Sequence, residues 1–181
     1  MFSAFSLAVN IAGGMLFALF PYYVNTKFGV ASAGLGALFF ISNLSMAISK
    51  GLAASIAKRL GNMKSVVFGV GLSSVFFFLM PLSPSFGLLA LLYVLRSGTR
   101  FMSDPILTSM FMKRIDEDEK STANSIRMIS MNGGGVVSPW LGGTMMESIG
   151  LDSPAFIGAG LTFVLAALYP VLLHKELSGS D

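Results

Sequence analysis

Long apolar runs alternate with short polar breaks along this chain. Six of the runs are long enough to cross a bilayer as a helix, which takes roughly 20 mostly apolar residues. The breaks between them contain Pro, Gly or charged residues, which end helices or avoid the apolar interior. This pattern predicts an all-α, polytopic membrane protein with six transmembrane helices, at about residues 2–24, 32–57, 65–80, 85–112, 121–149 and 155–173.

The basic residues predict how these spans are oriented. Three Lys or Arg lie in the break at 58–64, three in the break at 113–120 and one in the tail, whereas the opposite breaks contain Lys27 alone. Basic loops stay on the cytoplasmic side. We therefore expect a single six-helix transmembrane domain over residues 1–181, in the plasma membrane, with both termini cytoplasmic. The six helices are also compatible with a 3+3 inverted repeat, in which two sets of three helices run in opposite orientations across the membrane.

Composition supports a membrane protein and excludes several other classes. Hydrophobic residues make up 54% of the chain and charged residues 12%, against about 25% charged in soluble domains. The chain has no Cys, which excludes disulfides and thiolate metal sites. It has no basic stripe with interleaved aromatics, so we expect no nucleic-acid partner. No nucleophile stands beside a base and no phosphate loop follows a strand, so we expect neither an enzyme nor a cofactor or metal.

Five ionisable residues interrupt the apolar spans. Lys50 lies in the second span, Arg96, Arg100 and Asp104 in the fourth, and Arg127 in the fifth. Each costs about 2.5–3.5 kcal/mol on insertion scales, so intramembrane charges are candidates for function. The three in the fourth span are spaced i, i+4, i+8 and share one helix face. At about 10 Å from the cytoplasmic ends of their spans, Asp104, Lys50 and Arg127 could form one ion-pair layer.

Arg96 is the charge that is hardest to explain as structural. It is predicted near the membrane midplane and has no acidic residue at its depth, so an anionic group of a substrate or of a partner subunit is its natural complement. Lys50 has a simpler alternative, because its long side chain can extend to the interface. Asp104 and Arg127 also have a structural alternative, as an ion pair that joins the fourth and fifth helices.

The fifth span carries a cluster of small residues and a proline. Small residues allow membrane helices to approach closely, and proline bends a helix. Tight helix packing and a gating bend are both open interpretations of the cluster, whose members are Gly134, Gly135, Pro139, Gly142 and Gly143.

Three stretches, at 55–64, 93–105 and 134–143, together resemble the C-terminal six-helix half of a major facilitator superfamily transporter. The stretch at 55–64 is similar to the family's loop motif Gly-x-x-x-Asp-Arg-x-Gly-Arg-Arg, which Arg59, Gly61 and Lys64 fit. Ser55 replaces the first Gly and Lys58 replaces the Asp, so the acidic gate residue of the motif is absent. The stretch at 93–105 resembles an Arg-bearing tenth helix, and the one at 134–143 resembles the Gly-x-x-x-Gly-Pro-x-x-Gly-Gly signature of drug exporters.

The resemblance implies half of a secondary active transporter. Such a half would move a small solute, either drug-like or anionic, by alternating access, as a homodimer or with a second six-helix half. Arg96 and Arg100 would then serve substrate binding or coupling, and Asp104, Arg127 and Lys50 the cytoplasmic gate. The alternative is a non-transporting membrane remnant, or an interaction or assembly subunit.

Overall fold

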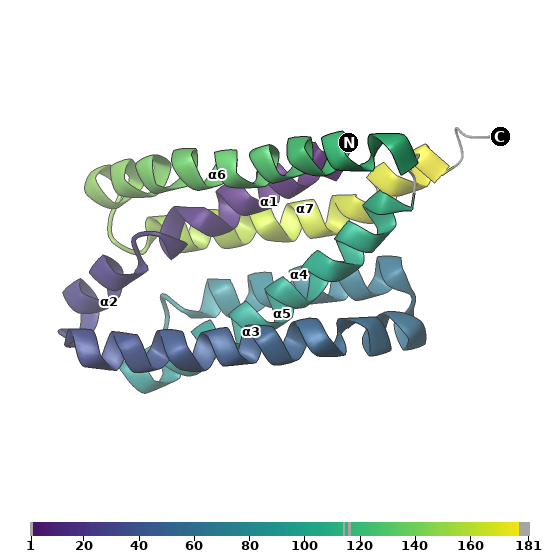
Figure 1. Cartoon of the computed structure of the whole chain (residues 1–181). Coiled ribbons are helices and arrows are strands. Elements are labelled where there is room, and N and C mark those ends of the chain that lie inside the picture. Colours follow the sequence, from purple (N-terminus) through teal and green to yellow (C-terminus); the bar gives the residue numbers. More distant parts are fainter. Residues whose placement is uncertain (1, 114, 116, 178–181) are drawn as a thin grey trace.

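The structure is a computed structural model that describes residues 2–113, 115 and 117–177. Within these residues it contains helices and no strand, which confirms the all-α prediction. Figure 1 shows the long helices running side by side. The helices are α1 (Phe2–Phe17), α2 (Phe20–Phe28), α3 (Ser32–Leu60), α4 (Asn62–Leu79), α5 (Phe86–Met112), the short 3-10 helix η1 (Glu117–Glu119), α6 (Lys120–Ser148) and α7 (Ser153–Leu177).

Four helical segments of the described chain are long and apolar enough to cross a bilayer. They are Leu7–Phe28, Ser32–Leu60, Asn62–Leu79 and Ser153–Pro170. Neither α5 nor α6 is among them, although both begin and end close to the expected fourth and fifth spans. In α5 two arginines lower the mean hydropathy, and α6 is rich in Ser, Asn and Gly.

The first expected span, 2–24, is two helices and not one. Helix α1 ends at Phe17, and α2 then runs past the expected boundary to Phe28. Pro21 explains the break, because proline has no amide hydrogen to donate to the carbonyl of Phe17, four residues earlier. Gly29 ends α2 with a φ of 63°, a left-handed conformation that suits glycine.

The basic break expected at 58–64 is almost entirely helical. Helix α3 continues to Leu60 and α4 begins at Asn62, so Gly61 alone separates them. Its φ of 83° is accessible to glycine at little cost. The sixth helix is also longer than expected, since α7 reaches Leu177 and includes the first part of the predicted tail. Likewise α6 begins at Lys120, one residue before the expected start of the fifth span at 121.

Helix packing follows the pattern that a 3+3 inverted repeat produces. Helix α1 packs against α6 and α7, α5 packs against α3 and α4, and α4 packs against α7. Exchanging α1 with α5, α3 with α6 and α4 with α7 reproduces the same set of pairs. In Figure 1, α1, α6 and α7 form the upper group and α3, α4 and α5 the lower one, and the start of α1 and the end of α7 lie at the same end of the bundle.

Two apolar clusters fill the bundle, one toward each end. The first gathers aromatic side chains, with the rings of Phe20 and Tyr93 stacked at 4.1 Å between centroids. The second includes Val70, Ile106 and Tyr169. Along α5, the arginines at 96 and 100 fall between residues of the two clusters. The protein thus places two cations in a layer between two apolar regions.

Candidate functional site

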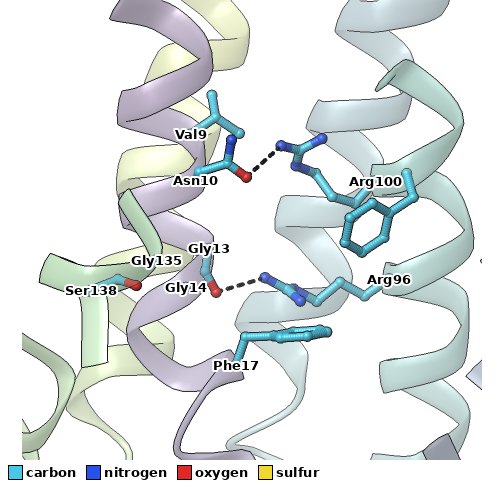
Figure 2. A pocket seen from close by; sticks show the side chains of 10 residues that line it. Val9, Asn10, Gly13, Gly14, Phe17, Arg96, Arg100, Gly135 and Ser138 are labelled. Carbon is cyan, nitrogen blue, oxygen red and sulfur yellow. Dashed lines mark hydrogen bonds between the residues drawn. The ribbon is translucent and has the colours of Figure 1, made fainter. Parts of the chain in front are cut away.

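A cavity of about 150 Å³ lies in this layer, lined by residues of α1, α5 and α6. Figure 2 shows the guanidinium groups of Arg96 and Arg100 pointing from α5 across it toward α1. Several water molecules or a small organic ion would fit in a space of this size. The lining residues are Val9, Asn10, Gly13, Gly14, Phe17, Arg96, Arg100, Phe101, Gly135 and Ser138.

Arg96 is buried and has no acidic partner among the described residues. One of its terminal nitrogens donates to the carbonyl oxygen of Gly13 at 3.2 Å, and the group stacks on the ring of Phe77, with the guanidinium carbon 4.1 Å from the centroid. A Cβ on Gly13 would lie 3.2 Å from that nitrogen, so glycine allows this approach. A guanidinium has five N–H donors, and one hydrogen bond to protein leaves most of them available to the cavity.

Arg100 is held by protein groups. It pairs with Asp104, one helical turn along α5, at 2.9 Å, and its other terminal nitrogen donates to Oδ1 of Asn10 at 3.5 Å. The arginine charge is therefore balanced within its own helix. Arg100 remains a lining residue of the cavity, but of the two arginines that line it, Arg96 is the one without an acidic partner in the described part of the chain.

Among the described contacts, none joins two members of the expected layer of Asp104, Lys50 and Arg127. The described partner of Asp104 is Arg100. Lys50 extends from α3, where its ammonium lies 5.3 Å from the ring centroid of Phe101, a cation–π arrangement. Arg127 lies on α6, which packs against α1 and not closely against α5. The side chain of Arg127 lies outside the described residues.

The small residues of α6 form its contact with α1. Gly134, Ser138 and Gly142 are buried at i, i+4 and i+8, so they form one stripe. A Cβ on Gly142 would overlap the carbonyl oxygen of Met15, and one on Gly14 of α1 would overlap the Ser138 hydroxyl. The close-packing interpretation therefore fits Gly134 and Gly142.

The other members of the predicted cluster lie beside this stripe. Gly135 lines the cavity, and a Cβ there would meet no other atom within 4 Å. A Cβ on Gly143 would have one neighbour within 4 Å, a side-chain carbon of Leu19 at 3.9 Å. Pro139 is half-buried within α6, and the assigned helix continues through it.

The predicted loop motif occupies the junction of α3 and α4. Gly61 forms the turn itself, while Arg59 and Lys64 are exposed on either side of it. Neither side chain makes a hydrogen bond or an ion pair to the described part of the chain. The structural contribution of the motif here is the tight turn at Gly61.

A polar network at the opposite end of the bundle was not anticipated from the sequence. The ammonium of Lys27 donates to Asp152 and to the carbonyl oxygen of Pro81, both at 2.6 Å. The hydroxyl of Tyr23 donates to the same carboxylate at 2.5 Å. These contacts connect α2, the α4–α5 linker and the turn before α7. Charge-assisted bonds of this kind are the stronger ones, so the network holds three segments together.

Sequence reasoning also missed residues around the cavity. Gly13 and Phe17 lie in the apolar second half of α1, and Phe77 comes from α4. Asn10 offered the one signal, as a carboxamide within an apolar run. The cavity has no reactive constellation, and among the described residues no three metal-ligating side chains gather. Its chemistry is that of a buried cationic surface, which suits an anion.

Comparison with known proteins identifies a family. The sequence profile of the Major Facilitator Superfamily matches residues 2–180. No curated protein matches the chain.

Proposed function

Because this chain belongs to the Major Facilitator Superfamily, whose members are transporters, we propose that it forms one half of a secondary active transporter for a small anionic solute. The observation that carries the proposal is the state of Arg96, a buried cation that faces a cavity and has no acidic partner among the described residues. A buried charge without a partner is costly. A bound anion would supply the missing charge and use the free N–H donors.

Alternating access needs a second half, and the exposed polar groups of α3 and α6 support one. Asn43 and Lys50 on α3 and Asn132 on α6 are exposed along the bundle. Lipid tails cannot hydrogen-bond such groups, so a partner or an aqueous pathway should cover them. The partner is a second copy of the six-helix domain or another six-helix half of the same kind.

The arrangement of charge supports an orientation for the domain. The basic residues at the α3–α4 and α5–α6 junctions lie at the end of the bundle where α1 begins and α7 ends. By the positive-inside rule this end is cytoplasmic, and the membrane is the plasma membrane. Asp104, Lys50 and Arg127 would then act near the cytoplasmic gate, with Arg96 deeper at the solute site.

The alternative is a membrane protein that does not transport, either a remnant or an interaction or assembly subunit. Such a protein would also present exposed helix faces to a partner. It would not need an anion at Arg96, so the two hypotheses differ in anion binding and transport.

The particle in detergent tests the two-half arrangement. We expect its protein mass to be at least twice the 19.2 kDa of one chain, either as two copies or with a second membrane chain of similar size. Light scattering combined with size-exclusion chromatography measures this mass, and native mass spectrometry identifies the components. A stable particle with the mass of one chain, unchanged in lipid nanodiscs, would contradict the arrangement.

A further inference from the structure

A second pocket lies at the end of the bundle where α3 ends, α4 begins and α5 ends. Its volume is about 230 Å³, and it is separate from the cavity at Arg96, with which it shares no lining residue. The residues that line it are Ala53, Ala54, Ala57, Lys58, Asn62, Pro105, Ile106, Ser109 and Lys113. The proposed solute site at Arg96 does not include this pocket.

The rim of the pocket is cationic. Lys58 comes from the last turn of α3 and Lys113 follows the last residue of α5, so two separate helices each bring one ammonium group. Both lysines are exposed, and neither forms an ion pair with a described residue. None of the described residues that line the pocket is acidic. The carboxamide of Asn62 and the hydroxyl of Ser109 add neutral donors.

The floor of the pocket is apolar. Ala53 and Ile106 are buried beneath it, and Ala54 and Ala57 continue the apolar surface along α3. Both α3 and α4 belong to the candidate membrane spans, and the pocket lies where they meet at Gly61. This level of a span borders on lipid headgroups. The ligand should therefore combine a negative charge above with hydrocarbon below.

We propose that this pocket binds an anionic phospholipid, with the phosphate between Lys58 and Lys113 and the start of an acyl chain over the alanines of α3. Lysines bind phosphate as point charges, and basic residues beside a span attract anionic lipids. Neutral lipids lack the net charge that two lysines would complement. Lys58 occupies the position where the resembling loop motif has an acid, so the charge at this position is reversed in this chain.

The test is lipid binding by the intact particle in detergent, measured by native mass spectrometry with phosphatidylglycerol, phosphatidylcholine and inorganic phosphate. We expect one phosphatidylglycerol per chain to be retained more tightly than phosphatidylcholine. Each lysine near an anionic headgroup contributes roughly fivefold, so a K58Q/K113Q variant should lose about 25-fold in affinity. The matched control is R59Q/K64Q, which removes two charges at the same end but outside the pocket, and should keep its affinity.

Each other outcome overturns the proposal. An equal loss in both double variants would mean general attraction to basic residues. Binding of phosphatidylcholine as strong as that of phosphatidylglycerol would remove the role of net charge. Phosphate that competes fully at equal concentration would show a free-anion site, and absence of any retained lipid would show no site. Circular dichroism and elution volume establish that the variants are folded, and K58R/K113R should restore binding if the fold is intact.

Discussion

An Arg96→Gln variant should lose the binding of small organic anions while it remains folded. The guanidinium makes one hydrogen bond to protein, at Gly13, stacks on the ring of Phe77 and also lines the cavity. Removing one partner of a buried charged pair costs about 2–5 kcal/mol, which is a loss of at least about 30-fold in affinity. Arg96→Lys should retain part of the affinity, because it keeps the charge but loses the planar donor fork.

The readout is the rise in unfolding temperature that added anions cause, measured over a panel of carboxylates, phosphates and sulfonates. In the absence of anion, Arg96→Gln should be as stable as the parent or more so, because it removes a buried cation that has no acidic partner in the described structure. Arg59→Gln makes the same change at an exposed position away from the cavity and serves as the control. A variant that responds to anions like the parent would refute the assignment of Arg96, and a variant that fails to fold would indicate a structural role.

Replacing Gly142 by alanine should destabilise the bundle. A Cβ at this position would overlap the backbone carbonyl of Met15, and a backbone atom cannot rotate away. Helices α1 and α6 would have to separate, and overpacking of this kind costs about 1–3 kcal/mol. The separation would also displace Asn10 and Gly13, which line the cavity from α1. Lower thermal stability should therefore accompany weaker anion binding.

Gly133→Ala is the matched control for this prediction. It makes the same change on the same helix, but its Cβ would meet no atom within 4 Å. Alanine is favoured over glycine inside a helix by about 1 kcal/mol, so Gly133→Ala should be neutral or stabilising. Unfolding followed by intrinsic fluorescence measures both variants. Equal destabilisation by the two changes would argue against the close contact between α1 and α6.

The sequence was most informative where apolar runs and charge spacing decide the structure. The run lengths predict α5 nearly to the residue, from 85–112 expected to Phe86–Met112 observed. The i, i+4 spacing of Arg100 and Asp104 predicts their pair, because neighbours on one helix face need no knowledge of the tertiary fold. Hydropathy alone, in contrast, does not reveal the break before Pro21 or the one-residue turn at Gly61. Both the break and the turn depend on the backbone conformation of one or two residues. A hydropathy average over many residues does not detect such a local feature.

The partners of the cavity could not be predicted for a different reason. Gly13 belongs to α1 and Arg96 to α5, which are 83 residues apart, and their contact depends on how the two groups of helices assemble. The Lys27–Asp152 network has the same origin, since it joins α2 to the turn before α7, 125 residues further along the chain. The symmetric set of packing pairs was equally hidden, because it depends on which helices pack together and not on similar loops.

Transport by the reconstituted particle is the decisive measurement for an anion transporter with Arg96 at its solute site. Proteoliposomes are loaded with a mixture of small organic anions, and mass spectrometry follows which of them leave when the outside is diluted. We expect at least one anion to be released by the parent particle and retained by vesicles that carry Arg96→Gln. Release of the same anions by both particles, or of none by the parent, would contradict this assignment.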